Sequence, residues 1–204
     1  MSQVSVTQIR ELRRLTGAGV GECRSALEQT TGHVEQAVRV LRDRAETARQ
    51  RDERDAREGA VGSYLHHTAK LGVLVEVGCE TDFVARTETF QTLVRQLAEQ
   101  IAAAAPTVVD RAELPAAEIE ARRRDLAEQA RAAGKPADVV DRIVAGRLEA
   151  YFATVALLDQ PWVREPGRTV GSLVKEAGAR LGEKLVVRRF VRVALGEEVG
   201  RAGS

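Results

Sequence analysis

The spacing of apolar residues changes along this chain, and this change limits the possible folds more strongly than any other feature. Towards the N-terminus apolar residues recur every three or four positions, as along one face of an α-helix. Between Val61 and Cys79 they alternate with polar residues, as along a half-buried β-strand. Helical spacing then returns, and a β-branched run from Leu185 to Leu195 follows it. Two strands, intervening helices and a late third strand predict an α+β fold with an antiparallel sheet.

Residues 1–46 have the pattern of three short helices. Ser5 and Gln8 have the spacing of a capping box, which predicts where the first helix begins. Gly17-Ala18-Gly19 should end that helix, and Thr31-Gly32 should end the second. We therefore expect a compact three-helix module that is only just large enough to sustain its own core.

A charged segment follows this module. Residues 42–58 interleave both signs of charge, and no apolar stripe continues after Leu41. We expect residues 47–58 to form a solvated linker or helix extension between two modules. A mobile connector is the simpler interpretation, and a recognition surface is the alternative.

The remaining residues, 59–204, are predicted to form the α+β core. Its first part is a hairpin at 60–79, its helices lie between 87 and 182, and its last strand spans 184–195. Residues 157–166 contain two prolines and are interpreted as a turn.

Several residues mark the expected helix ends in this core. Thr87 and Thr169 are suitable N-caps for the helices that follow them. Gly134-Lys135-Pro136 should separate two helices, and Gly182 should form a C-cap.

The composition excludes several classes of protein. The net charge is +1 and only 3% of residues are aromatic, which argues against a general nucleic-acid binder. No apolar stretch approaches the roughly 20 residues that span a bilayer, and residues 1–10 lack the features of a signal peptide. Cys23 and Cys79 are too few for a disulfide framework, so a reducing, cytoplasmic location is expected.

No constellation of catalytic or metal-binding residues is evident. Gly17-x-Gly19-x-Gly21 joins two helices and has no preceding strand, so a helix–helix turn is expected rather than a phosphate-binding loop. His66 and His67 are adjacent in a predicted strand, should point to opposite faces, and lack a third ligand nearby. We therefore expect no metal, no cofactor and no enzymatic activity.

The loop after the second strand, Thr81-Asp82-Phe83-Val84, places an acid and an aromatic residue at a corner of the chain. One interpretation is that Phe83 folds back as a plug between sheet and helix while Asp82 caps the helix. The other is that the loop contacts a partner, because loops run over the surface. Taken alone, the loop favours the plug, since a buried phenylalanine is the common case.

Several motifs occur in one order along nearly the whole chain. They are Thr16-Gly17-Ala18-Gly19-Val20, Gly62-Ser63-Tyr64-Leu65-His66-His67, Gly72-Val73-Leu74-Val75-Glu76, Cys79-Glu80-Thr81-Asp82-Phe83-Val84-Ala85, Leu157-Leu158-Asp159-Gln160-Pro161-Trp162, Thr169-Val170-Gly171 and Val187-Arg188-Arg189-Phe190-Val191-Arg192. In this combination the chain resembles the bacterial elongation factor Ts family. The resemblance implies a three-helix module similar to ubiquitin-associated domains, followed by helices packed on a three-stranded antiparallel sheet.

The resemblance also implies a function, namely guanine nucleotide exchange on elongation factor Tu, the GTPase that carries aminoacyl-tRNA to the ribosome. Family members push the Asp-Phe pair of their Thr-Asp-Phe-Val motif into the GTPase domain and disturb its magnesium and phosphate site. The partner-binding residues implied here are Arg13, Thr16, Gly17, Ala18, Gly19, Val20, Thr81, Asp82, Phe83 and Val84. The core is implied to touch the third domain of the GTPase. The implied role therefore favours a Phe83 that contacts a partner over a Phe83 that plugs the space between sheet and helix.

The chain departs from the family pattern in a few places. Thr68-Ala69 replaces a glycine or asparagine near the strand turn, and Val20 replaces a frequent methionine. The core also lacks the second copy of the sheet unit that longer members carry. Short members can complete their sheet by pairing two chains, which implies a possible homodimer through the sheet.

Two rival functions remain open at this stage. The three N-terminal helices could read DNA, with Arg188, Arg189 and Arg192 contacting phosphates. The near-zero net charge weighs against direct nucleic-acid binding. Alternatively, the module could be an adaptor for ubiquitin-like partners without exchange activity.

Overall fold

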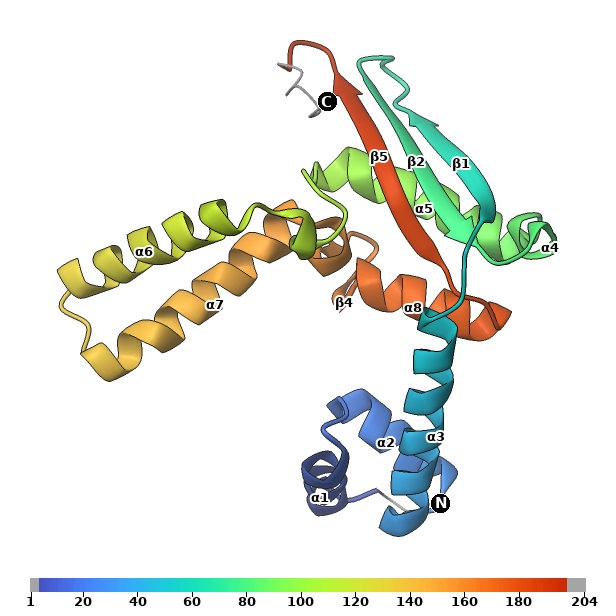
Figure 1. Cartoon of the computed structure of the whole chain (residues 1–204), viewed down its shortest axis with the longest axis vertical. Helices are drawn as coiled ribbons and strands as arrows, with labels where there is room; N and C mark the ends of the chain where they lie inside the picture. Colours follow the sequence, from blue (N-terminus) through green and yellow to red (C-terminus); the bar gives the residue numbers. More distant parts are fainter. Residues whose placement is uncertain (1–3, 198–204) are drawn as a thin grey trace. The chain divides into compact units, whose positions relative to one another are not determined.

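The computed structural model describes residues 4–197 of the chain. It divides into two compact units, Met1–Arg54 and Asp55–Ser204, which are described separately (Figure 1). Residues 1–3 of the predicted N-terminal module and residues 198–204 of the predicted core lie outside the described residues.

The first unit consists of the helices α1 (Val6–Thr16), α2 (Val20–Gln29) and α3 (Val34–Asp52). The predicted capping box is confirmed, since the Ser5 N–H donates to Gln8 Oε1 at 2.9 Å and the Gln8 N–H donates to Ser5 Oγ at 3.2 Å. The three helices enclose a small core. Its buried residues are Ile9, Leu12, Cys23, Ala26, Leu27, Ala37 and Leu41.

Helix α3 continues into the charged segment and ends at Asp52. Arg49 lies within 3.6 Å of Glu46 and 3.9 Å of Glu53, at helical spacings of three and four residues. These exposed pairs each stabilise a helix only slightly. The charged segment is therefore helical up to Asp52, and the first strand begins six residues later, at Glu58.

The second unit is built on a three-stranded sheet in the order β1 (Glu58–Leu65), β2 (Leu71–Cys79), β5 (Val186–Ala194). Both pairings with the central strand β2 are antiparallel. The predicted α+β fold with a three-stranded antiparallel sheet is thereby confirmed. The register between β2 and β5 shifts between Glu76 and Val77, as at a β-bulge.

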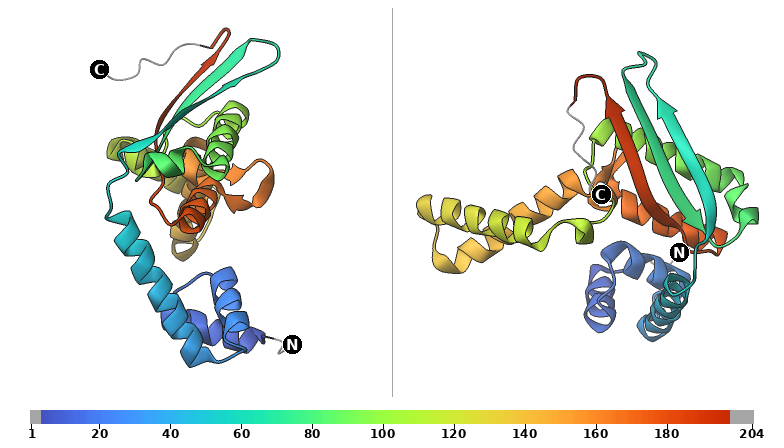
Figure 2. Two further views of the ribbon diagram at one scale, coloured as in Figure 1. Left: turned by 90° about the vertical axis from the view of Figure 1, so that its right-hand side faces the viewer. Right: turned by 45° about the horizontal axis from the view of Figure 1, so that its top comes forward.

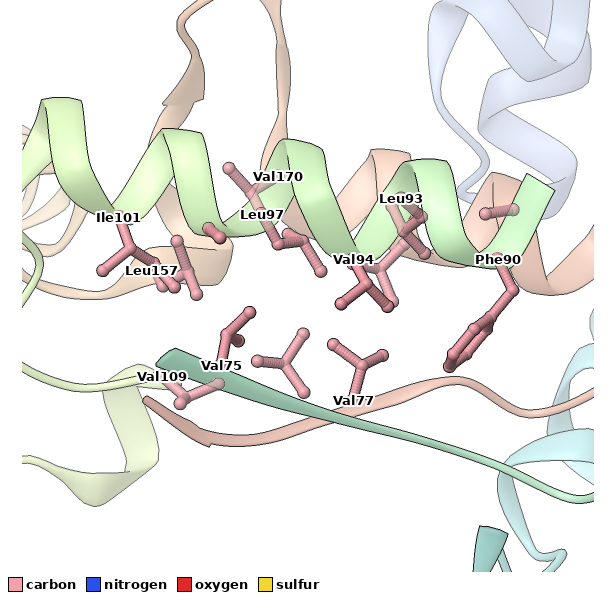
Figure 3. Packing of buried hydrophobic residues seen from close by; sticks show 14 of the residues in the cluster. Val75, Val77, Phe90, Leu93, Val94, Leu97, Ile101, Val109, Leu157 and Val170 are labelled. Carbon is pink, nitrogen blue, oxygen red and sulfur yellow. The ribbon is translucent and has the colours of Figure 1, made fainter. Parts of the chain in front are cut away.

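One face of the sheet packs against α5 (Glu88–Ala104) and α8 (Val170–Leu181). Val75 and Val77 point from β2 towards Val94 and Phe90 of α5 (Figure 3). Phe90 has no exposed surface and is among the largest fully buried side chains. Figure 2 shows the helices of this unit on one side of the sheet only.

The helices α6 (Ala116–Ala132) and α7 (Ala137–Val155) form a hairpin with a separate small core. Its base joins the rest of the unit where Arg111 pairs with Glu149 of α7 at 2.9 Å and with Asp159 at 2.7 Å. The helix ends predicted at Thr87, Thr169 and Gly182 are confirmed.

The predicted turn at 157–166 is wrong in part, because it contains regular structure. A 3₁₀ turn (Leu157–Asp159) leads into a small antiparallel hairpin of β3 (Pro161–Trp162) and β4 (Glu165–Thr169). Prolines are depleted in strands, which hid this hairpin from the sequence pattern. Buried Gln100 holds it in place by donating to Gln160 Oε1 at 3.1 Å and to the Pro161 carbonyl at 3.2 Å.

The burial of Phe90 gives a stability prediction. Phe90→Ala should lower the unfolding free energy of this unit by about 3–5 kcal/mol, because it removes apolar burial and leaves a cavity. Urea denaturation followed by the fluorescence of Trp162, the single tryptophan, measures the change. Phe83→Ala is the matched control, since replacing this exposed phenylalanine should change the unfolding free energy by less than about 0.5 kcal/mol. Equal losses in the two variants would contradict the burial described here.

Candidate protein-binding site

The loop that follows β2 is a single turn of helix, α4 (Asp82–Ala85), rather than an irregular loop. Thr81 is its N-cap, and its hydroxyl accepts the Val84 N–H at 3.3 Å. Thr87 caps the next helix in the same way, accepting the Phe90 N–H at 3.3 Å. Two successive threonine caps therefore define a corner between β2 and α5.

Phe83 projects from this corner into solvent. Its side chain is 78% exposed, an unusual state for a phenylalanine. The alternative in which Phe83 plugs the space between sheet and helix is therefore wrong, because Phe90 fills the core at this end of α5. Asp82 does not cap the helix either, since Thr81 does.

Val84 lies on the inner side of the same turn and is only 6% exposed. Along with buried Ala85, it anchors α4 against the core. Val84 was predicted among the partner-binding residues; unlike Phe83, it faces the core in the free chain, and partner binding by this residue stays a prediction. Helical geometry explains the difference, because neighbouring residues of one turn point in different directions.

The polar groups beneath the corner are well satisfied. The Cys79 thiol donates to the Thr81 carbonyl at 3.1 Å, and the Thr87 hydroxyl donates to the Val84 carbonyl at 2.8 Å. The amide of Gln91 donates to the Ala85 carbonyl at 2.7 Å. These bonds hold a segment of only four helical residues in one conformation.

Asp82 is exposed and forms an ion pair with Arg86, 2.8 Å away and four residues later. Solvent surrounds both side chains, and exposed pairs of this kind contribute about 0–1 kcal/mol. The carboxylate can therefore exchange Arg86 for a partner's donor with little loss.

The turn between α1 and α2 contains the other predicted residues. The Thr16 hydroxyl donates to the Leu12 carbonyl at 2.8 Å and accepts the Ala18 N–H at 3.3 Å. Gly17 has a φ of 71°, a left-handed conformation that glycine adopts without strain, and its N–H donates to the Arg13 carbonyl at 2.8 Å. The turn is thus rigid, and Val20 at the start of α2 is half-exposed.

Sequence reasoning missed Leu15, which is also exposed near this turn. Its spacing of three residues from Leu12 is typical of the apolar face of a helix, so the sequence alone indicates burial. Leu12 is fully buried, whereas Leu15 lies outside the small core. Leu15 and Val20 are thus exposed apolar side chains on either side of the turn.

The two histidines differ from the sequence expectation. Because β1 ends at Leu65, His66 and His67 belong to the turn, and their ring centroids lie 4.1 Å apart instead of on opposite faces. His66 Nδ1 is 2.8 Å from the Thr68 hydroxyl. Residues 4–197 contain no group of three or more potential metal-binding side chains.

The arginines of β5 that could contact phosphates face carboxylates. Arg188 and Arg189 pair with Glu76 at 3.5 and 2.7 Å, and Arg192 pairs with Glu197.

Within the described part of the chain, no helix is long and apolar enough to cross a membrane.

The state of Cys79 provides a test of the corner. Burial raises the pKa of its thiol, and the negative charge of Glu183 raises it further. The thiolate is the reactive form, so Cys79 should react with iodoacetamide much more slowly in the folded protein than in urea. The labelling reaction should also begin at a higher pH in the folded protein. Peptide mass spectrometry measures the labelling. Equal rates at neutral pH in the two states would contradict the closed corner.

Comparison with known proteins gives a consistent result. A family profile described as "Elongation factor TS" matches residues 4–197. Elongation factor Ts of Heliobacterium modesticaldum is 46% identical over 97% of this chain and 93% of its own length. The proteins of the same name from Geobacter sulfurreducens and Coprothermobacter proteolyticus are 44% and 45% identical, over 95% and 96% of this chain and 90% and 100% of their own lengths. The chain therefore belongs to the elongation factor Ts family.

Proposed function

We propose that this protein accelerates GDP release from elongation factor Tu by inserting Phe83 and Asp82 into the GTPase domain. Membership of the family supports the general role of a nucleotide exchange factor in translation elongation. The observation that carries the specific proposal is the 78% exposure of Phe83 on a turn held by buried residues and hydrogen bonds.

The exposed ring supplies binding energy to the complex. Moving Phe83 from water into an apolar pocket of a partner contributes about 1.5–3 kcal/mol. Because the corner is already ordered, little of that energy is lost in fixing its conformation. A flexible loop with the same residues would bind more weakly.

Asp82 acts beside the ring on the phosphate side of the nucleotide site. Phosphates are held in part by Mg²⁺, whose octahedral coordination tolerates little displacement. A GTPase conformation that accommodates Phe83 misplaces the groups around the ion. The exposed carboxylate of Asp82 then competes for nearby donors and opposes the return of phosphate. No covalent bond is made or broken, so the protein acts as a binding factor and not as an enzyme.

The energy must come from more than one contact. Whatever the factor subtracts from nucleotide affinity, the nucleotide subtracts equally from the affinity of the factor. Switching a partner almost completely between two states requires about 5.5 kcal/mol of differential affinity, which exceeds the contribution of Phe83. We assign the remainder to the α1–α2 turn with Leu15 and Val20, acting on the GTPase domain, and to core contacts with the third domain.

Phe83→Ala should leave the fold intact and lower the limiting rate of GDP release about ten- to a hundredfold, as expected for losing 1.5–3 kcal/mol. Stopped-flow fluorescence of a labelled GDP on elongation factor Tu measures this rate. Val163→Ala is the matched control, since Val163 is an exposed apolar residue elsewhere in the same unit. An unchanged rate for Phe83→Ala would exclude the proposed mechanism.

We further propose that two copies of the chain pair through the uncovered face of the sheet. Val61, Leu65, Leu74, Val191 and Val193 are all exposed on that face. The strand register places Leu74 between Ser63 and Val191, and Gly72 between Leu65 and Val193, so apolar side chains lie on all three strands of this face. None of the described elements of the second unit covers it (Figure 2), and exposed apolar side chains gathered on a sheet favour association.

The dimer gives its own prediction. Leu74→Lys, at the centre of the patch, should shift the protein from dimer to monomer, because pairing would bury two unpaired charges. Sedimentation velocity measures the mass in solution, and Val163→Lys is the control for an added surface charge. A wild-type protein that stays monomeric at millimolar concentration would contradict the pairing.

A further inference from the structure

The carboxylate of Glu183 lies directly behind the corner that displays Phe83. Glu183 follows α8 and precedes β5, yet its Oε2 accepts the N–H groups of Glu80 at 2.9 Å and Thr81 at 3.1 Å. Its Oε1 accepts the hydroxyl of Thr81 at 2.6 Å. One side chain thus binds three donors of the segment that leads into α4, 103 residues away in the sequence.

The contact is reciprocal. The Lys184 N–H donates to Glu80 Oε1 at 2.6 Å, so each segment holds the other's backbone with a carboxylate. Gly178 allows the backbone of Glu183 to lie against the end of α8, since a Cβ there would lie 2.8 Å from the Glu183 carbonyl oxygen. Hydrogen bonds to charged groups are stronger than neutral ones, so these bonds fix the corner firmly.

The bond to the Thr81 hydroxyl also sets the direction of α4. By donating its proton to Glu183, the hydroxyl turns a lone pair towards the Val84 N–H, which it caps at 3.3 Å. The orientation of this cap determines where the following residues, Asp82 and Phe83, project. Glu183 has no need to touch the partner to exert this effect.

We propose that Glu183 is a positioning residue for nucleotide exchange, which holds residues 81–85 in the orientation that presents Phe83 and Asp82 to the GTPase. The proposal rests on the exchange function proposed above. Without the carboxylate, the corner samples other orientations, and only a fraction of molecules is ready to bind. The apparent affinity then falls in proportion to that fraction, whereas the complex that does form is unchanged.

This mechanism separates two kinetic quantities. If only about a tenth of Glu183→Ala molecules hold the corner in the productive orientation, the half-saturating concentration of the factor rises about tenfold. The limiting rate of GDP release at saturation stays the same. Glu183→Gln keeps an oxygen for the two N–H groups of Glu80 and Thr81, so it should restore most of the affinity. Phe83→Ala, by contrast, lowers the limiting rate.

The experiment measures GDP release from elongation factor Tu against the concentration of wild-type, Glu183→Ala, Glu183→Gln and Phe83→Ala proteins. Glu176→Ala is the matched control, because this carboxylate of α8 pairs with Arg168 and not with residues 79–87. Hydrogen exchange of the peptide spanning residues 79–87 is recorded without the partner. Faster exchange in Glu183→Ala together with the raised half-saturating concentration is the expected result.

Wild-type half-saturation for Glu183→Ala, or a reduced limiting rate instead, would overturn the positioning role. If Glu183→Ala does not fold, Glu183→Met, which keeps the length of the side chain but removes the oxygens that bind Glu80 and Thr81, decides the question: a half-saturating concentration equal to wild type, with unchanged hydrogen exchange, would overturn the positioning role. Failure of the proposed function has a different signature. In that case Phe83→Ala releases GDP like the wild type, while the change in hydrogen exchange at the corner is still seen.

Discussion

Val75 and Val77, at the centre of the three-stranded sheet, pack against Val94 and Phe90 on α5 (Figure 3). The corner that displays Phe83 depends on this contact. It fixes the end of β2 and the start of α5, and thereby leaves only a short corner between them. A corner with both ends fixed needs few bonds to become rigid. This explains how four helical residues can hold a large apolar side chain in water without collapse onto the core.

The display of Phe83 is a departure from efficient folding. Burying that ring within the chain would stabilise the folded state, yet the core position at this end of α5 is occupied by Phe90. The caps at Thr81 and Thr87 turn the backbone so that Val84 faces inwards and Phe83 outwards. The apolar surface of this ring is thus left uncovered in the free chain. Similar reasoning applies to the exposed Leu15 and Val20 of the first unit and to the uncovered face of the sheet.

Much of the fold follows from local chemistry and was predictable. The capping box at Ser5, the caps at Thr87 and Thr169, and the C-cap at Gly182 each involve residues within a few positions of one another. Alternation at Val73, Val75 and Val77 likewise identified the inner face of β2. Local signals of this kind survive in most tertiary settings.

The missed features depend on short elements or distant contacts. Helix α4 has only four residues, too few for a helical period to be visible, and the prolines of the β3–β4 hairpin resemble a turn. The exposure of Leu15 became visible only with the packing of the three helices. Nothing near Glu183 in the sequence indicates that its carboxylate binds Glu80 and Thr81, because that contact exists only once the sheet has formed.

The proposed entry of Phe83 into the GTPase during exchange can be measured by hydroxyl-radical footprinting of the wild-type protein. Free in solution, Phe83 should be oxidised readily, while fully buried Phe90 serves as the internal reference. In the nucleotide-free complex with elongation factor Tu, oxidation of Phe83 should fall to the level of Phe90, and excess GDP should restore it. Unchanged oxidation of Phe83 in the complex would show that its ring stays outside the GTPase.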